Sequence, residues 1–450
     1  MANARIKFIL MTIGLVLLAS CSSNPAWMKP TGKAASVPDD SVAFSTYAEE
    51  SRENIQSVLD DLRFQNGAAT SPYLGGYSSK EIAKMRGPFQ VPAEDNNMCW
   101  DSALGGGKGF LLIHGLTDSP YLMRNISDSL HKAYPCALIR AVLLPGHGTV
   151  SGDTLDMTYK DWVRITSYGV HSFQKMDKIK ELYLAGFSTG TTLALNYMKE
   201  GSNTEKIKGL ILLSAAVKAK SKFAFLSPYL RGVMDWVDKK GERDGARYES
   251  FSLNAGAEFY ELTKNLTSSI YTLDVPVLMA VSADDETIDP YAARDFFCDR
   301  MVSERTLIWY QSRFTEKQAL PSASCEKDIV TRQMKDLDQN YNGTSYRFTN
   351  FAHTGISMGP GDKHYGVNGK YRSCKYYEGK EDGSFKKCQN ESQHSFFGET
   401  NTRYLTDQGK PGYLYLRRGT FNPDYEKLEQ AMICFTTEGC DLKRVLTVDE

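Results

Sequence analysis

The sequence lacks a surplus of charge of either sign. Its 450 residues contain 53 Lys and Arg against 54 Asp and Glu. Proteins that bind nucleic acid usually present an excess of basic residues, so this balance argues against a nucleic-acid partner. The mean hydropathy of -0.40 and the 41% of hydrophobic residues are typical of a soluble globular protein. A chain of this length exceeds one ordinary hydrophobic core, so we expect one large domain with insertions or extensions.

The N-terminal apolar run is too short for a comfortable membrane span. Residues 8–18 follow Arg5 and Lys7 and have the length of the hydrophobic region of an export signal. They lead into LASC at 18–21, which resembles the bacterial lipobox, where the cysteine is lipidated and becomes the mature N-terminus. An ordinary cleaved signal that happens to contain a cysteine is the alternative.

The lipobox interpretation assigns a role to each part of the N-terminus. Residues 1–20 are then a lipoprotein signal peptide and Cys21 carries the lipid, while residues 21–40, rich in Pro, Gly and Ser, form a flexible tether. No aspartate follows Cys21, which by resemblance to lipoprotein sorting favours the outer membrane. We therefore expect a protein of the bacterial cell envelope, anchored by its lipid to the outer membrane and facing the periplasm.

Metal-binding spacing is absent as well. The chain has no C-x-x-C and no paired Cys and His spacing, so neither a zinc site nor a cofactor is expected. Eight cysteines remain besides Cys21, and an even number in an exported chain indicates disulfides. Many connectivities are open. Pairs between sequence neighbours are the simplest, and we predict two of them, Cys374–Cys388 and Cys434–Cys440.

The periodicity of apolar residues predicts strands alternating with helices. Residues 41–64 form one long amphipathic helix, and 41–100 are expected to pack on the main domain. The pattern indicates a mostly parallel α/β sheet with functional loops at the carboxyl ends of its strands. Strands are predicted at 109–113, 137–143, 182–185, 207–213, 275–281, 306–311 and 345–350, and helices at 121–132, 159–176, 191–198 and 423–435.

The pentapeptide GFSTG at 186–190 lies between a predicted strand and a predicted helix. A serine at the tip of such a sharp turn needs neighbours without Cβ atoms, which the two glycines provide. Ser188 would project its hydroxyl out of the sheet, at a helix N-terminus that favours developing negative charge. An ordinary Gly/Ser turn is the alternative reading.

Further motifs follow the other predicted strands: HG at 114–115, LPGHG at 144–148, an acidic loop at 282–290 and a histidine at 353. Together with GFSTG they resemble the α/β-hydrolase fold, and within it the carboxylesterase and monoacylglycerol-lipase branch. The resemblance covers roughly residues 85–360 and the final helix. It implies a hydrolase core at 101–216 and 271–358, a helical cap insertion at 217–270, and an extension at 359–450 that contains a disulfide.

The resemblance also implies the site residues. Ser188 is the expected nucleophile, His353 the base, with His364 as its next competitor, and the backbone N–H groups of Leu116 and Thr189 the oxyanion hole. The acid is harder to assign, because the loop 282–290 carries four carboxylates.

One of these carboxylates has a separate role. Asp289 precedes Pro290 as a helix N-cap would. In the family the acid stands three residues before an apolar residue that anchors the loop, and Asp285 before Ile288 matches that pattern. Asp284 and Glu286 are then expected in a solvated acidic turn.

Two segments leave their roles open. Seven aromatic residues of the cap segment fit a cap that lines a pocket, and fit helix cores equally well; they are Phe223, Phe225, Tyr229, Trp236, Phe251, Phe259 and Tyr260. The long stretch 355–422 is either functional or disordered, as loops of that length usually are.

The resemblance implies a serine hydrolase that cleaves small or lipid carboxylic esters through an acyl-enzyme. A serine peptidase of the same fold and a non-catalytic envelope lipoprotein are the alternatives.

Substitution of Cys21 tests the predicted anchor. Cys21→Ser removes the thiol that would be acylated, so the protein should move from the membrane fraction to the soluble periplasm or fail to mature. Fractionation and mass spectrometry of the mature N-terminus measure this. Unchanged fractionation together with an unlipidated N-terminus would refute the anchor.

Overall fold

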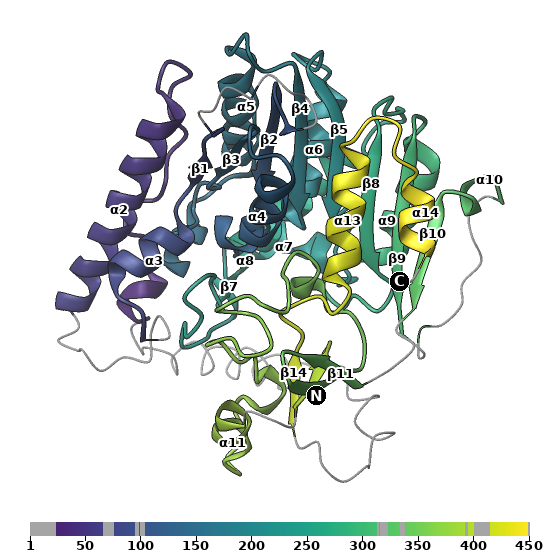
Figure 1. The fold of residues 1–450 in the computed structure, drawn as a ribbon. Coiled ribbons are helices and arrows are strands. Elements are labelled where there is room, and N and C mark those ends of the chain that lie inside the picture. The colour runs from purple at the N-terminus through teal and green to yellow at the C-terminus, as the bar shows by residue number, and fades with distance from the viewer. Residues whose placement is uncertain are drawn as a thin grey trace, which may run out of the picture.

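A computed structural model describes residues 24–65, 76–94, 99, 104–312, 315, 323–333, 338–391, 395–399 and 415–448. The predicted signal peptide and Cys21 lie outside these residues. An eight-stranded sheet forms the centre of the molecule, in the order β1-β3-β2-β4-β5-β8-β9-β10 (Figure 1). Its strands are β1 (Phe89–Val91), β2 (Lys108–Ile113), β3 (Leu138–Val142), β4 (Glu181–Phe187), β5 (Ile207–Leu213), β8 (Val277–Ser282), β9 (Arg305–Gln311) and β10 (Ile329–Gln333).

The sheet is parallel apart from one edge pair, because β1 runs antiparallel to β3. A mostly parallel sheet was expected from the alternating pattern, and this expectation is confirmed. Its central strands are buried on both faces, which explains their continuous apolar runs. Such strands need a layer of helices on each side.

Successive residues of β2 show these two layers. Phe110 and Leu112 face a core that includes residues of α4 (Arg124–Ala133) and α13 (Tyr425–Phe435). Leu111 and Ile113 face the opposite core, because side chains alternate along a strand. That second core is built by α5 (Tyr159–Gln174), α6 (Thr189–Glu200), α8 (Leu253–Thr267) and α9 (Pro290–Arg300).

A second, smaller sheet lies beside the first, in the order β11-β12-β13-β14. Its strands are β11 (Asp338–Tyr341), β12 (Thr344–Phe348), β13 (Ser395–Gly398) and β14 (Tyr415–Arg418). The prediction that 345–350 forms a strand of the main sheet is therefore wrong. β12 pairs antiparallel with β11 and parallel with β13, which comes from the long extension.

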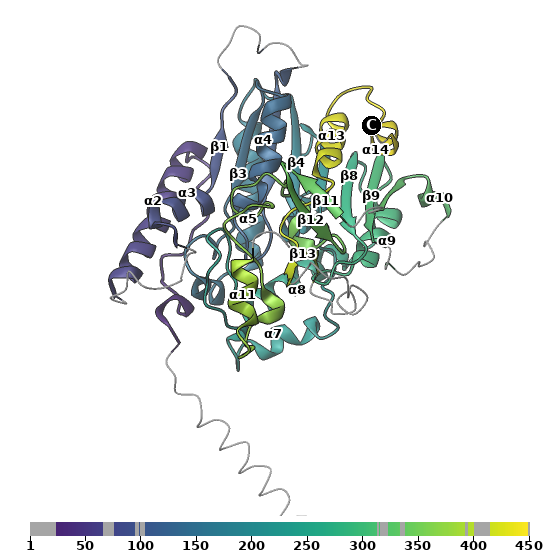
Figure 2. The same cartoon turned by 60° about the horizontal axis from the view of Figure 1, so that its bottom comes forward.

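Aromatic packing accounts for this pairing. The ring of Phe348 on β12 stacks on that of Phe397 on β13 and meets that of Phe421 edge to face. The edge position of the main sheet next to β9 is taken instead by β10. Figure 2 shows β11, β12 and β13 of the small sheet near the middle of the view.

The segment 217–270 is only partly helical. It begins with η6 (Ala224–Leu226) and α7 (Ser227–Leu230), followed by the two-stranded sheet of β6 (Trp236–Asp238) and β7 (Phe251–Ser252). The longer helix α8 packs into the main core through Leu262 and Leu266, both fully buried. The predicted cap insertion is therefore confined to residues before α8, and even these contribute Val217 and Ala246 to the main cores.

The N-terminal residues lie along the domain from residue 24 onward. Met28 of η1 (Ala26–Met28) is buried, and the hydroxyl and backbone N–H of Thr31 both bind Asp153 of η5 (Ser151–Leu155). This stretch belongs to the predicted flexible tether, and these contacts hold it against the core. The amphipathic helix α2 (Phe44–Gln65) follows, with Phe44 stacked on Tyr168 of α5, and α3 (Ser79–Arg86) comes next. Within the described residues, no helix combines the length and apolarity that a bilayer crossing requires.

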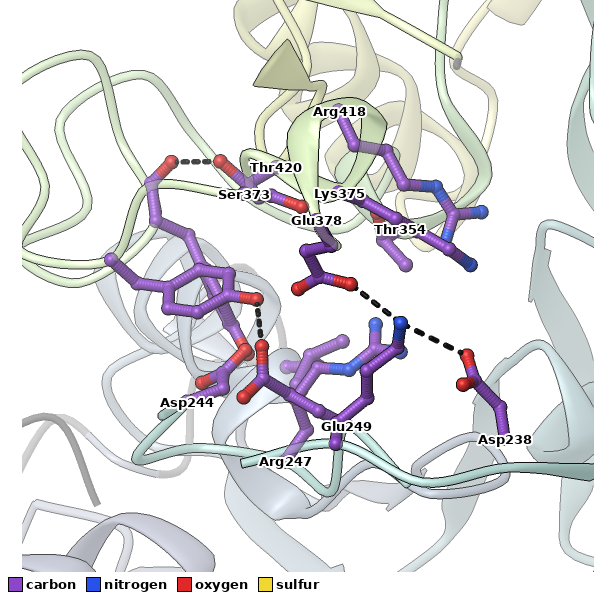
Figure 3. A pocket seen from close by; sticks show the side chains of 14 residues that line it. Asp238, Asp244, Arg247, Glu249, Thr354, Ser373, Lys375, Glu378, Arg418 and Thr420 are labelled. Atoms are coloured by element: carbon purple, nitrogen blue, oxygen red, sulfur yellow. Dashed lines mark hydrogen bonds and ion pairs between the residues drawn. The ribbon is translucent and has the colours of Figure 1, made fainter. Parts of the chain in front are cut away.

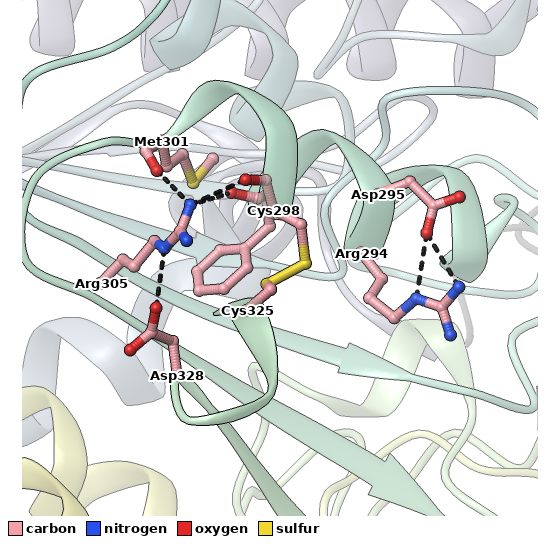
Figure 4. The surroundings of a disulfide bond; sticks show 8 residues. Arg294, Asp295, Cys298, Met301, Arg305, Cys325 and Asp328 are labelled. Carbon is pink, nitrogen blue, oxygen red and sulfur yellow. Dashed lines mark hydrogen bonds and ion pairs between the residues drawn. A yellow bond between two sulfur atoms is a disulfide. The ribbon is translucent and has the colours of Figure 1, made fainter. Parts of the chain in front are cut away.

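Four disulfides join cysteines that are neighbours in sequence. Cys374–Cys388 and Cys434–Cys440 are confirmed, and Cys99–Cys136 and Cys298–Cys325 complete the set. In Figure 4, Cys325 of α10 (Ala323–Glu326) is tied to α9, beside the guanidinium of Arg305. Arg305 binds Asp328 at 3.0 Å and the carbonyl oxygens at the end of α9.

The remaining short helices are η4 (Pro120–Met123), η7 (His353–Gly355), η8 (Lys375–Tyr377), α11 (Ser384–Asn390) and α14 (Leu442–Thr447).

Two buried histidines fasten the loops that follow β2 and β3. His114 Nε2 accepts a hydrogen bond from the backbone N–H of Leu144, and His147 Nε2 accepts one from that of Thr117. Each loop therefore holds the other. Burial lowers the pKa of His147 to about 4 and that of His114 well below its usual value, so both rings are neutral at pH 7.

The depressed pKa of His147 predicts a loss of stability in acid. Between pH 6.5 and about 4 the unfolded chain takes up a proton at this ring while the folded protein does not, so the free energy of unfolding falls as pH is lowered through this range. His147→Gln keeps an acceptor for Thr117 and should reduce that fall by roughly 2 kcal/mol in urea unfolding at pH 7 and 4.5. The control is His171→Gln at a partly exposed position. An unchanged pH dependence in His147→Gln would contradict the assignment.

Candidate active site

The turn between β4 and α6 holds Ser188 in a strained conformation. Its backbone φ of 51° lies in the left-handed region, which residues other than glycine rarely adopt. A Cβ atom on Gly186 would lie 2.5 Å from the Gly190 carbonyl carbon, and one on Gly190 would lie 2.0 Å from the Ile113 oxygen. Only glycine fits at either position, so the turn closes as the pentapeptide predicts.

Ser188, His353 and Asp285 form one chain of hydrogen bonds. His353 Nε2 lies 2.9 Å from Ser188 Oγ, and His353 Nδ1 lies 2.6 Å from Asp285 Oδ2. All three residues are buried. Because the carboxylate accepts the Nδ1 hydrogen, Nε2 is left to accept the hydrogen of the serine hydroxyl. The three side chains predicted to act together therefore lie in contact.

The acidic loop separates the roles of its carboxylates. Oδ1 of Asp285 accepts hydrogen bonds from the backbone N–H groups of Thr287 and Ile288, at 2.7 and 2.9 Å, which aims Oδ2 at His353. Asp289 accepts the N–H of Ala292 and caps α9, as predicted.

The neighbouring carboxylate turns away from the histidine. Asp284 binds the Thr315 hydroxyl and the Ser312 N–H, and burial raises its pKa. The expectation that Asp284 belongs to a solvated turn is therefore wrong, whereas Glu286 is exposed.

The competing histidine belongs to a different cluster. His364 Nε2 lies 2.7 Å from Asp244 Oδ1, and its Nδ1 lies 2.9 Å from the Tyr77 hydroxyl. It makes no hydrogen bond to Ser188. This buried pair ties the extension to the loop between β6 and β7 and to the segment before α3.

Glu399 is a residue of the site that sequence reasoning missed. Its Oε1 accepts the backbone N–H of His353 at 2.9 Å, and its Oε2 lies 2.9 Å from Arg418 Nε. Burial acts to raise the pKa of Glu399, but the charge and hydrogen bond of Arg418 outweigh it and hold the pKa below its usual value. Residue 399 lies 46 positions after His353, directly after β13, and no local pattern marks it.

A pocket of about 630 Å³ opens above Ser188 and His353. One part is apolar, and the other part is polar, around Arg247, Glu249, Lys375 and Arg418. The aromatic residues of the predicted cap divide into two groups. Phe223, Phe251 and Phe259 line the pocket. Phe225 and Tyr229 are exposed and do not line it. The apolar lining consists of Leu116, Phe223, Leu226, Leu230, Met234, Val237, Phe251, Leu253, Phe259 and Ile288.

Leu116 and Thr189 line this pocket beside Ser188. Their backbone N–H groups donate no hydrogen bond to any residue in the described part of the chain. The next residue, Thr117, fixes the conformation of the loop that contains Leu116. Its φ is 62°, and its backbone N–H donates a hydrogen bond to His147 Nε2. Two unused donors at a helix N-terminus and an adjacent loop suit an oxygen that gains negative charge.

In the part of the chain that the structure describes, no group of three or more His, Cys, Asp and Glu side chains is arranged to hold a metal ion.

Comparisons with known proteins agree with this architecture. Residues 110–314 match the sequence family described as "Serine aminopeptidase, S33". A thermostable monoacylglycerol lipase from Bacillus sp. (strain H-257) is 26% identical over 212 residues, which cover 46% of this chain and 82% of that protein.

Two solved structures are distant matches. A soluble variant of monoglyceride lipase from Saccharomyces cerevisiae is 18% identical with a TM-score of 0.40, covering 50% of this chain and 82% of its own. The monoacylglycerol lipase of Paleococcus ferrophilus is 17% identical with a TM-score of 0.39, covering 54% and 94%. The similarity therefore rests on the family match over residues 110–314 and on the Bacillus monoacylglycerol lipase, and together with the mainly parallel sheet it supports an α/β-hydrolase fold.

Proposed function

We propose that the protein is a serine hydrolase that cleaves carboxylic esters. The observation that carries the proposal is the hydrogen-bonded chain from Asp285 through His353 to Ser188, which opens into a largely apolar pocket. A serine hydroxyl is inert until a base removes its proton, and this arrangement supplies the base and fixes its tautomer.

The geometry supports an acyl-transfer sequence. Ser188 Oγ attacks the ester carbonyl while His353 Nε2 takes its proton, and Asp285 stabilises the imidazolium that forms. The carbonyl oxygen gains negative charge and accepts hydrogen bonds from the N–H groups of Leu116 and Thr189. His353 then protonates the leaving alcohol, and water releases the acyl group from Ser188 by the reverse steps.

Acyl esters fit the shape and polarity of the pocket. The apolar lining from the cap segment suits an acyl chain, and the Bacillus relative is named as a monoacylglycerol lipase. The proposed lipid on Cys21 would hold the enzyme beside membrane lipids, which are a source of such esters.

A serine peptidase is the second candidate, because the matching family is described as a serine aminopeptidase. Both activities need the same three side chains. Matched ester and amide substrates with one acyl group separate them, and we expect the ester to be hydrolysed faster.

Ser188→Ala should abolish hydrolysis of short-chain p-nitrophenyl esters and labelling by a fluorophosphonate, since both require the hydroxyl. The fold should persist, because alanine adds no atoms to the turn. Labelling and circular dichroism measure the two effects separately. Turnover near the wild-type rate in Ser188→Ala would end the proposal.

The acidic loop offers a matched pair of variants. Asp285→Asn should lower kcat by roughly 10³ to 10⁴, because the amide no longer fixes the tautomer of His353. Asp284→Asn, one residue away, should leave kcat close to wild type, since Asp284 binds Ser312 and Thr315 and not the histidine. Steady-state kinetics decide the matter, and a reversed order of effects would refute the assignment of the acid.

A further inference from the structure

The polar end of the pocket continues into a second hollow of about 60 Å³. The two hollows share one wall, whose residues are Asp238, Arg247, Glu249, Thr354, Lys375 and Arg418. Figure 3 shows Lys375 and Arg418 reaching in from the extension, with Arg247 and Glu249 coming from the loop before β7 on the opposite side. Lys375 and Arg418 lie outside the residues that match the family.

Three cations stand on the shared wall, and they differ in their partners; a fourth, Lys240, lines only the smaller hollow and is paired with Asp238 and Glu378. Arg247 lies 3.5 Å from Asp118, and Arg418 binds Glu399 and the Thr287 hydroxyl. The side chain of Lys375 makes no hydrogen bond or ion pair with any residue that the structure describes, and only its backbone carbonyl accepts a hydrogen bond, from the N–H of Glu378. Its ammonium group is therefore available to a ligand.

The carboxylates around the hollow are already satisfied. Glu378 lies 2.6 Å from Lys240 and 2.9 Å from Arg243, and Asp238 lies 3.4 Å from Lys240.

Two deeper carboxylates are satisfied as well. Asp244 is paired with His364, while Glu249 accepts the Tyr371 hydroxyl at 2.7 Å. Burial, with repulsion from Asp244, raises the pKa of Glu249, so its negative charge is disfavoured. None of these four groups forms an ion pair with Lys375.

The electrostatics at Lys375 agree with an unmet positive charge. Partial burial, followed by the charges of Arg418 and Arg247, lowers the pKa of Lys375, and these cations outweigh the opposing effect of Asp238. An anion bound among the three cations would relieve this repulsion.

The wall also adjoins the base of the proposed mechanism. Thr354, which lines both hollows, directly follows His353. His353 is the group that protonates the leaving alcohol in the proposed mechanism, so groups beside it face the alcohol part of the ester. In that mechanism the acyl chain would occupy the apolar part of the larger pocket.

We propose that Arg247, Lys375 and Arg418 form an anion-binding subsite, and that the substrate is an ester whose alcohol carries a phosphate or carboxylate group. This rests on the proposed esterase function. The extension then determines specificity by adding two of the three cations to the hydrolase core.

Matched substrates test the subsite. The first pair compares kcat/KM for monohexanoylglycerol phosphate with kcat/KM for neutral monohexanoylglycerol, and tests phosphate. The second pair compares O-hexanoyl lactate, which has a free carboxylate, with its neutral methyl ester, and tests carboxylate. We expect wild type to prefer at least one anionic ester. Lys375→Gln should lower that preference about tenfold through KM, as loss of a charged hydrogen bond does.

Two further variants and a binding measurement complete the test. Lys375→Arg should keep most of the preference, and Lys363→Gln, an exposed lysine of the same extension outside both hollows, should keep all of it. Glycerol phosphate should bind to wild type in calorimetry and bind at least several-fold more weakly to Lys375→Gln.

The outcomes separate the two proposals. Equal kcat/KM for the anionic and the neutral ester of each pair in wild type would overturn the subsite and leave the esterase proposal standing. The same holds if Lys375→Gln lowers kcat/KM equally for the anionic and the neutral ester. Failure to hydrolyse any ester overturns the proposed function, and the calorimetry then still decides whether the anion binds.

Discussion

The close contact between the turn at Ser188 and the end of β2 is the constraint on which the site depends. Gly190 lies so near the Ile113 carbonyl that no side chain fits between them, and Ser188 takes a left-handed φ as a result. The strain is sustained because β4 is hydrogen-bonded between β2 and β5 and cannot relax. The hydroxyl is thereby raised above the sheet edge, where loops from three other strands can reach it.

Those loops are fixed by side chains that do no chemistry. His114 and His147 cross-link the loops after β2 and β3, so the N–H of Leu116 is held beside Ser188. Thr287 and Ile288 orient Asp285, and Glu399 holds the backbone of His353. A site assembled from loops is in this way given the rigidity of the sheet below it.

Local patterns in the sequence predicted the parts of the structure that local physics decides. GFSTG predicts the turn because only glycine permits it, and the resemblance to the hydrolase family predicts the acid, because Asp285 stands three residues before Ile288 as the acid does in that family. The strands of the main sheet are recognisable since burial on both faces demands continuous apolar runs. Pairings between distant segments have no such signature. β12 was assigned to the wrong sheet because its partner β13 lies beyond a long irregular stretch, and Glu399 is invisible for the same reason.

The disulfide between Cys374 and Cys388 makes one wall of the pocket depend on an oxidised bond. Lys375 directly follows Cys374, and the bridge, packed on Tyr377, closes the small core that supports this segment. The wall of the pocket beside His353 is thus built on an oxidised covalent link, whereas Ser188, His353 and Asp285 are held by the sheet and by hydrogen bonds alone. Reducing this bridge would remove the covalent support of that wall, so the proposed anion-binding subsite should form fully only in an oxidising environment.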